Sequence, residues 1–218
     1  FGDFNYNTTF TATSNKNKIK KLASDVKNPV SGELMDLSDI KLGRFRLREG
    51  GEVGALYADR RVEKNDEGYI PYNPGQTIAT ENTTPFKIGT VNPKWNLGWR
   101  HGFNYKGINA SVMFTARIGG NVISKTQATL DRFGVSKASA DAREAGYVML
   151  GNIKMEPQDY YGTIYDLDSY YVYSATNIRL QEASIGYTLP NKWFGNVVKN
   201  VNVSVYGTNL WMIYNKAP

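Results

Sequence analysis

The sequence predicts an all-β protein: a segment of an antiparallel transmembrane β-barrel, with about eight strands and one short helix in an extracellular loop. Three observations predict this class. Long segments alternate strictly between apolar and polar side chains. The links between these segments alternate between short and long. The composition combines 28 aromatic residues (15 Tyr, 9 Phe and 4 Trp) with a mean hydropathy of only -0.46, which suits strands that are apolar on one face.

The clearest alternation lies in two adjacent segments, residues 95–105 and 108–118. Aromatic or aliphatic side chains occupy every second position in both, and polar residues or glycines fill most of the positions between them. A period of two places alternate side chains on opposite faces of a strand. Each segment has about the length that crosses a bilayer as a tilted strand. Only Lys106-Gly107 separates them, so we expect a hairpin with a two-residue turn.

Other segments repeat the pattern more or less clearly. We expect further strands over 4–12, 42–48, 52–60, 178–189 and 201–211. The strands over 42–48 and 52–60 are weaker and are joined through Gly50-Gly51. The apolar set of 178–189 changes parity near Gln181-Glu182, which predicts a β-bulge there.

The expected links differ in length in an ordered way. Short links are expected at 49–51, 106–107 and about 190–200, and long links at 14–41, 61–94 and 119–175. Outer-membrane barrels have short periplasmic turns and long extracellular loops. An up-and-down zigzag of strands would satisfy every link. In the longest link, Ser136 can cap a helix rich in alanine that Gly146 can end.

Several functional classes find little support in the sequence. There is no Cys and no apolar run near the roughly 18 residues of a transmembrane helix. The net charge of +6 is scattered, so a nucleic-acid partner is not expected. His101 has no triad partners, and the acidic stretches 65–68 and 166–168 lack full calcium-loop spacing. We therefore predict no enzyme, no catalytic residue, no metal site and no cofactor.

Seven short stretches resemble one family in their order and spacing. They are 14–19, 88–95, 116–120, 134–143, 178–182, 186–190 and 207–211, for example Gly-Thr-Asn-Leu-Trp in the last. These stretches are similar to the SusC/RagA family of TonB-linked (TonB-dependent) outer-membrane transporters, in the C-terminal part of the β-barrel.

The resemblance implies a barrel of about 22 strands, with residues 1–218 forming part of one C-terminal barrel domain. The plug, TonB box, N-terminal extension and final strand would then lie outside this chain, and its first residues would begin inside a strand. The implied function is TonB-energised import of an oligosaccharide, or less favourably a peptide, across the outer membrane of a Gram-negative bacterium. The implied partners are a SusD-like surface lipoprotein, TonB, and outer-membrane lipid and lipopolysaccharide. The alternative is a soluble β-sandwich, a glycan-binding or adhesin module.

The candidate site residues form three sets. Aromatic residues expected at the lipid interface are Trp95, Trp99, Phe103, Tyr105, Phe114, Tyr187 and Trp211. Residues expected to face the lumen are Arg100, Asn104, Asn109, Arg117, Arg179 and Asn202. Loop tyrosines expected to contact the ligand or the partner lipoprotein, or else to pack within the loop, are Tyr160, Tyr161, Tyr165, Tyr170, Tyr171 and Tyr173.

A cluster of lysines follows the first strand. Lys16, Lys18, Lys20 and Lys21 lie within six residues. They either contact lipopolysaccharide phosphates or form a solvated charged loop, and the second reading is favoured.

Overall fold

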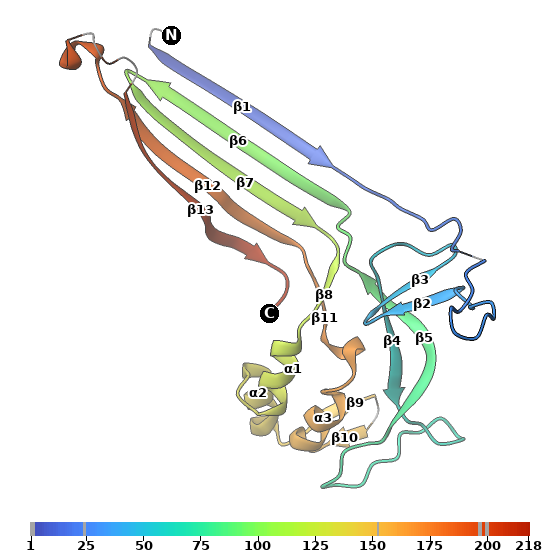
Figure 1. The fold of residues 1–218 in the computed structure, drawn as a ribbon. Coiled ribbons are helices and arrows are strands. Elements are labelled where there is room, and N and C mark those ends of the chain that lie inside the picture. The colour runs from blue at the N-terminus through green and yellow to red at the C-terminus, as the bar shows by residue number, and fades with distance from the viewer. Residues whose placement is uncertain (1–2, 24, 152, 196–197, 199–200) are drawn as a thin grey trace. The chain divides into compact units, whose positions relative to one another are not determined.

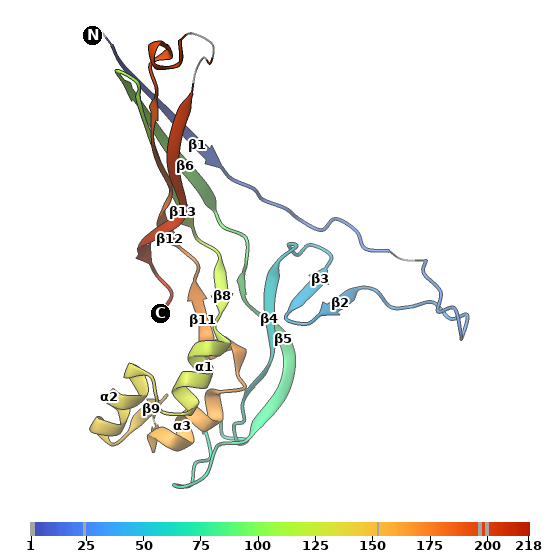
Figure 2. The same ribbon diagram turned by 60° about the vertical axis from the view of Figure 1, so that its left-hand side comes forward.

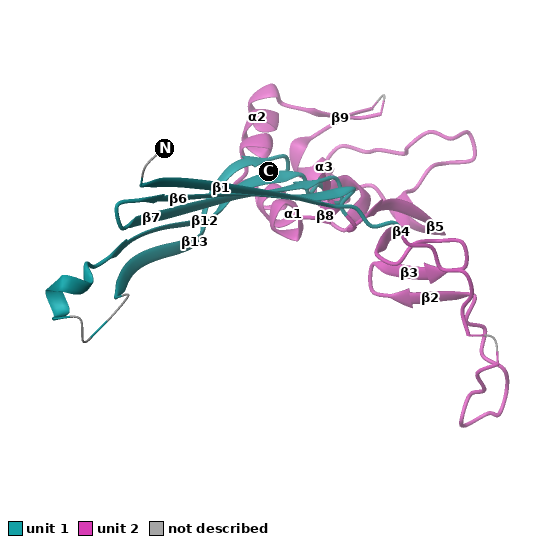
Figure 3. Ribbon diagram, turned by 90° about the horizontal axis from the view of Figure 1, so that it is seen from above, with its two compact units in different colours: residues 1–16, 93–120, 174–217 teal, residues 17–92, 121–173, 218 magenta. Residues whose placement is uncertain are grey.

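The structure is a computed structural model that describes residues 3–23, 25–151, 153–195, 198 and 201–218. Phe1, Gly2 and part of the expected link at 190–200 lie outside the described residues. The chain divides into two compact units, coloured separately in Figure 3. We call residues 1–16, 93–120 and 174–217 the strand unit, and residues 17–92, 121–173 and 218 the loop unit.

The strand unit is a five-stranded antiparallel sheet in the order β1-β6-β7-β12-β13 (Figure 1). Its strands are β1 (Phe4–Thr13), β6 (Trp95–Tyr105), β7 (Ile108–Ile118), β12 (Asn177–Thr188) and β13 (Asn202–Asn215). The prediction of long antiparallel strands at these positions is confirmed. Three of the five have 10 or 11 residues, and β12 and β13 extend to 12 and 14.

The turn between β6 and β7 is the predicted two-residue hairpin. Tyr105 and Ile108 are paired, and Lys106 and Gly107 have φ of 47° and 89°. Two consecutive positive φ values are the signature of a type I′ turn, whose twist matches that of the strands. Glycine tolerates this backbone without strain. A Cβ at position 107 would also lie 3.0 Å from the carbonyl oxygen of Thr188.

The bulge predicted near Gln181-Glu182 is present. Leu180 pairs with Phe114 on β7 and with Trp211 on β13, whereas Glu182 pairs with Met113 and Thr208. The extra residue on β12 reverses the parity of the faces, as the change in the apolar pattern predicts.

The predicted zigzag of successive strands is wrong. β1 pairs along its whole length with β6, from Phe4 opposite Tyr105 to Thr13 opposite Asn96. The weak strands expected over 42–48 and 52–60 therefore do not lie between them, and belong to a separate sheet. They are shorter, and Ala55–Val62 is buried over much of both faces, unlike the one-sided strands of the strand unit.

The second sheet, in the loop unit, has the order β2-β3-β4-β5. Its strands are β2 (Asp39–Leu42), β3 (Phe45–Arg48), β4 (Ala55–Val62) and β5 (Thr80–Thr90). The turn between β2 and β3 falls at Gly43-Arg44, because Leu42 pairs with Phe45. The pairing recorded between β3 and β4 is that of Phe45 with Leu56. β5 replaces part of the link expected at 61–94. Pro85 and the register shift beside it interrupt the alternation of apolar and polar side chains, so the sequence pattern does not predict this strand.

The helix expected between Ser136 and Gly146 is confirmed as α2 (Lys137–Ala145). The Ser136 side chain accepts from the Ser139 N–H, and Gly146 is left-handed. The expectation of only one helix is wrong, because α1 (Lys125–Arg132) and α3 (Pro157–Ile164) flank it. Both have only eight residues, too short for a clear helical period. Figure 2 shows the three helices gathered together.

Short elements complete the described chain. In the loop unit, β9 (Val148–Leu150) pairs with β10 (Ile153–Met155). β8 (Asn121–Ile123) pairs with β11 (Val172–Ser174), whose last residue, Ser174, begins the third segment of the strand unit. Two 3-10 helices are η1 (Asp168–Tyr171) and η2 (Asn191–Phe194). Within the described ranges, no helix is both long and apolar enough to cross a membrane.

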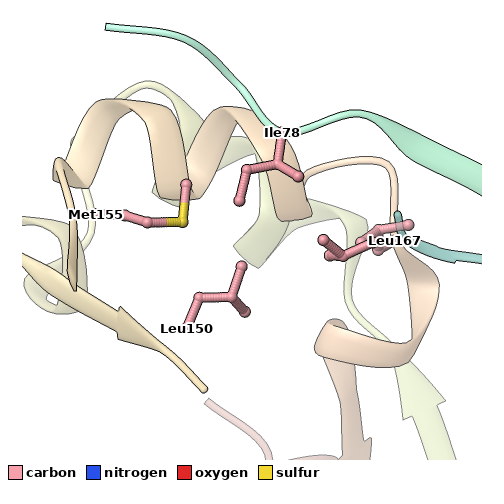
Figure 4. Packing of buried hydrophobic residues seen from close by; sticks show 5 residues of the cluster. Ile78, Leu150, Met155 and Leu167 are labelled. Carbon is pink, nitrogen blue, oxygen red and sulfur yellow. The ribbon is translucent and has the colours of Figure 1, made fainter. Parts of the chain in front are cut away.

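The buried clusters identified in the described chain lie in the loop unit. One is formed by Val62, Ile78, Leu150, Met155 and Leu167, four of which are labelled in Figure 4. The other contains Ala128, Tyr161, Ile164 and Tyr171. Asp159 of α3 holds the segment 72–75 beside this helix, because its carboxylate accepts from the Tyr72 hydroxyl at 2.9 Å and from the Gly75 N–H at 2.8 Å.

Leu167 is fully buried, so its truncation should leave a cavity in the loop unit. We expect Leu167→Ala to destabilise this unit by about 2–5 kcal/mol. Leu130→Ala removes the same atoms from a side chain that is 38% exposed, and should cost about 1 kcal/mol or less. The measurement is the rate of limited proteolysis between residues 17 and 92 in the intact protein. Equal rates for the two variants would contradict the assigned core.

The β6–β7 turn yields a second prediction. Gly107→Ala should destabilise the hairpin by about 1–2 kcal/mol, because it forces an L side chain into a left-handed conformation. Lys106→Gly changes the neighbouring turn position and should not destabilise, since glycine relieves the positive φ there. Urea unfolding of the intact protein, followed by tryptophan fluorescence, measures both. A lower midpoint for Lys106→Gly than for Gly107→Ala would refute the type I′ assignment.

Candidate functional site

One face of the strand unit is apolar from edge to edge. The seven predicted interface aromatics all lie on it, as the strand register shows. One row across the sheet consists of Phe10, Trp99, Phe114, Leu180 and Trp211, and another of Phe4, Tyr105, Ile108, Tyr187 and Val203. The two rows are six residues apart on β1, β6 and β7, or about 20 Å along a strand. The structure thus brings together the aromatics that the alternation selects, and their contact with lipid stays a prediction.

This apolar face is exposed to a large extent. Phe10 is 62% exposed, Trp211 64% and Val205 73%. An exposed apolar surface of this kind favours aggregation in water, and such surfaces mark a contact with membrane or protein.

Polar atoms on the apolar face are paired with one another. His101 lies here with Thr8, between the two aromatic rows. Its Nδ1 is 2.7 Å from the Tyr6 hydroxyl, and the Trp99 indole N–H donates to the Thr8 hydroxyl at 3.0 Å. Polar groups outside water are costly unless they are hydrogen-bonded. The single histidine is therefore part of a hydrogen-bonded polar cluster on this face.

The opposite face is polar and contains all six predicted lumen residues. Arg100 forms an ion pair with Glu182 across the sheet, and the side-chain amides of Asn109 and Asn202 both donate to the Thr188 hydroxyl at 3.0 Å. The remaining predicted residues, Asn104, Arg117 and Arg179, share this face by register. These bonds cross strands β6, β7, β12 and β13, so the polar side chains stabilise the sheet. That they face a lumen stays a prediction.

The predicted loop tyrosines form a cluster within the loop unit. Tyr171 and Tyr161 are buried, with 1% and 8% of their surface exposed. Tyr160 packs edge-on against Tyr161 at 5.1 Å between ring centroids, and burial raises the pKa of Tyr160 to about 12. Tyr161 and Tyr171 therefore pack within the loop, which is the alternative role given for these tyrosines above. Tyr170 is exposed, while Tyr165 and Tyr173 are half-buried, and ligand or partner contact by these side chains stays a prediction.

Acidic residues near the tyrosines have structural partners. Asp168 accepts from Arg44 at 2.6 Å and from Lys125 at 2.8 Å. Although burial opposes ionisation, these two cations hold the pKa of Asp168 below its ordinary value. The stretch 65–68 is a turn closed by the Gly68 N–H on the Asn65 carbonyl. In the described part of the chain, no group of three potential metal ligands occurs.

The lysine cluster lies on an exposed segment. The backbone of Ile19 exchanges hydrogen bonds with Gly50 and Gly51, and the Val53 N–H donates to the Asn17 side chain. The four lysines Lys16, Lys18, Lys20 and Lys21 are all exposed. The fixed backbone presents them to solvent, and a contact with lipopolysaccharide stays a prediction.

The structure also shows a groove that the sequence does not reveal. A cavity of about 640 Å³ lies among α1, α2 and α3, and Arg132 and Arg143 both line it. A second cavity of about 580 Å³ shares Arg132 and Gln158 with the first. The residues come from separate segments of the loop unit. The sequence pattern does not predict α1 and α3, so it gives no sign that the residues of this cavity lie close together.

Comparison with known proteins places the chain. No family model matches. TonB-dependent receptor P3 of Formosa agariphila is 26% identical over 232 aligned residues, which cover 95% of this chain and 22% of that protein. Among solved structures, the RagAB peptide importer in its "closed-closed" state matches 100% of this chain and 25% of that chain, with a TM-score of 0.61 and 17% identity.

The "open-open" state of the same importer matches 99% of this chain and 24% of that chain, with a TM-score of 0.60 and 17% identity. At this identity the structural matches establish the fold. The chain spans about a fifth of the length of the curated relative. The sequence match and the shared fold agree with the resemblance carried by the motifs: the chain is similar in sequence to a TonB-dependent receptor and similar in fold to the RagAB peptide importer.

Proposed function

We propose that the chain forms part of the barrel wall of an outer-membrane, TonB-energised nutrient importer. The observation that carries this proposal is the strand unit: five antiparallel strands of 10–14 residues with one exposed apolar face and one hydrogen-bonded polar face. Strands of this length cross a bilayer when tilted. Lipid would cover the apolar face, and the polar face would line the interior.

The connections of the sheet support the same proposal. Thr13 pairs with Asn96, and Arg117 pairs with both Asn96 and Asn177, so both long connections leave and re-enter the sheet at one end. The β6–β7 turn lies at the other end. This is the loop asymmetry of outer-membrane barrels, with the long connections on the cell exterior.

The two outer strands of the sheet define what the rest of the barrel must supply. β1 pairs only with β6, and β13 only with β12, among the described strands. An open sheet edge is not tolerated in the hydrocarbon region, because its backbone groups lack partners. We infer that further strands of the same protein pair with both edges and close a barrel of about 22 strands.

The sandwich alternative is disfavoured by exposure. A soluble sandwich buries the inner faces of its two sheets against each other. In this chain the identified buried clusters lie in the loop unit, whereas Trp211 and Val205 of the strand unit remain mostly exposed.

The cargo and partners follow from the resemblance. We propose import of an oligosaccharide, captured together with a SusD-like surface lipoprotein and driven through TonB. A peptide is the second candidate, and the similarity in fold to the RagAB peptide importer supports it.

Location and size in the native membrane test the transporter proposal. An antibody against this chain should detect a heat-modifiable outer-membrane band several times larger than 24.4 kDa, because folded barrels resist detergent until boiled. The comparison is between boiled and unboiled samples of fractionated membranes. A soluble band near 24 kDa that ignores boiling would favour the sandwich instead.

A pair of adjacent residues tests which face meets lipid. Val205 and Tyr206 are 73% and 76% exposed and point to opposite faces of β13. We expect Val205→Arg to destabilise the folded protein in membranes by about 1–3 kcal/mol, because it places a cation in lipid. Tyr206→Arg adds the same charge on the polar face and should be tolerated. The measurement is the fraction of heat-modifiable protein after refolding into lipid vesicles across a urea series, and a reversed order of the two variants would contradict the assignment of the faces.

A further inference from the structure

The groove in the loop unit has the size and composition of a ligand site. Its two cavities of about 640 and 580 Å³ each fall in the range of small-molecule pockets. Arg132 and Gln158 line both cavities, and residues of α3 contribute to each, so we call the two cavities together the groove. Other polar groups on its walls are the side chains of Gln76, Thr77, Ser139, Arg143 and Tyr161.

The two arginines of this groove differ from four other arginines of the loop unit, which are paired with carboxylates. Arg44, Arg46, Arg48 and Arg61 each form an ion pair with a carboxylate at 2.5–2.6 Å. Among the described residues, no carboxylate lies within 4.0 Å of the guanidinium of Arg132 or Arg143. Both residues line the groove, and their guanidinium groups keep their capacity to bind an anion.

Local structure positions both side chains. The Arg132 guanidinium lies over the Tyr165 ring, 4.3 Å from its centroid. Arg143 extends past Gly134, where a Cβ would come within 2.5 Å of its Nη1 atom. Gly134 also has a φ of 70°, so glycine is doubly suited to this position. An arginine held in place loses less conformational entropy when it binds a ligand.

The carboxylates along the groove already have partners or lie at its rim. Asp131 is buried and accepts from the Gln127 amide at 2.7 Å. Asp159 is buried and accepts from the Tyr72 hydroxyl and the Gly75 N–H. Glu156 is exposed at the start of α3. Three carboxylates therefore lie beside the two arginines; those of Asp131 and Asp159 are held by neutral donors, and none of the three pairs with Arg132 or Arg143.

We propose that this groove binds carboxylate groups of an oligomeric ligand, with Arg132 and Arg143 as the recognising residues. Arginine binds carboxylates with two parallel hydrogen bonds, which gives both strength and orientation. The amides of Gln76 and Gln158 supply neutral donors and acceptors for the rest of the oligomer. This inference rests on the proposed function, in that the groove would select the anionic members of the imported nutrient class.

Direct binding to the intact protein in detergent tests the groove. The probes for isothermal titration are hexagalacturonate, its fully methyl-esterified form and penta-glutamate. We expect binding of at least one carboxylate probe, no binding of the ester, and weaker binding at high salt. Hexagalacturonate and penta-glutamate distinguish a sugar from a peptide source of the carboxylate. Absence of binding by both acids, or equal binding of the ester, would overturn the proposal.

Substitutions then assign the residues. Arg132→Gln and Arg143→Gln should each weaken binding at least about tenfold, and Arg143→Lys should weaken it less, because it keeps the charge but loses the bidentate geometry. Arg61→Gln is the matched control: it removes one positive charge from the same unit, outside the groove, and should leave binding unchanged. Equal loss in all variants would show a general charge effect and refute the site.

The fold of each variant is checked by heat modifiability and by its proteolysis pattern. These readouts do not depend on the groove. A protein that is a heat-modifiable outer-membrane barrel but binds neither acid disproves the groove alone, whereas a soluble protein disproves the importer.

Discussion

The pairing of five long strands in one continuous register is the constraint on which the strand unit depends. Every antiparallel pair keeps alternate side chains on the same face, so a slip of one residue would exchange the whole apolar set with the polar set. The bulge at Gln181 shows how strongly this constraint acts. The sequence of β12 changes parity at that point, and the backbone inserts one residue so that both halves of the strand keep their apolar side chains on the same face.

The two faces stabilise the sheet in different ways. On the polar face, side chains bond across strands, as Asn109 and Asn202 do by meeting at the Thr188 hydroxyl. On the apolar face, Trp99 and His101 have hydrogen-bonding partners on β1. Both arrangements suit a sheet with lipid on one side and water or protein on the other, and both support the importer that we propose.

The strand unit was largely predictable from the sequence, because alternation is a local signal. The β6–β7 hairpin and the bulge at Gln181 each follow from a few neighbouring residues. The same is true of one element of the loop unit, the α2 helix with its Ser136 and Gly146 caps. The loop unit was less predictable. β5 contains Pro85 and a register shift, and α1 and α3 are too short to show a period. The pairing of β1 with β6, the burial of Tyr171 and the proximity of Arg132 and Arg143 depend on contacts between distant segments, which no local pattern encodes.

The pairing of β1 with β6 has a consequence for the order of folding. The β6–β7 hairpin closes over two residues and can form early, whereas β1 can join β6 only after the chain between them has been ordered or looped out. Closing a long loop costs entropy that grows slowly with its length, but contacts between distant residues slow the search for the native pairing. We therefore expect the sheet to grow outward from the β6–β7 hairpin, with β1 among the last strands to add. The loop unit has its own buried clusters, so we expect it to fold before β1 pairs with β6.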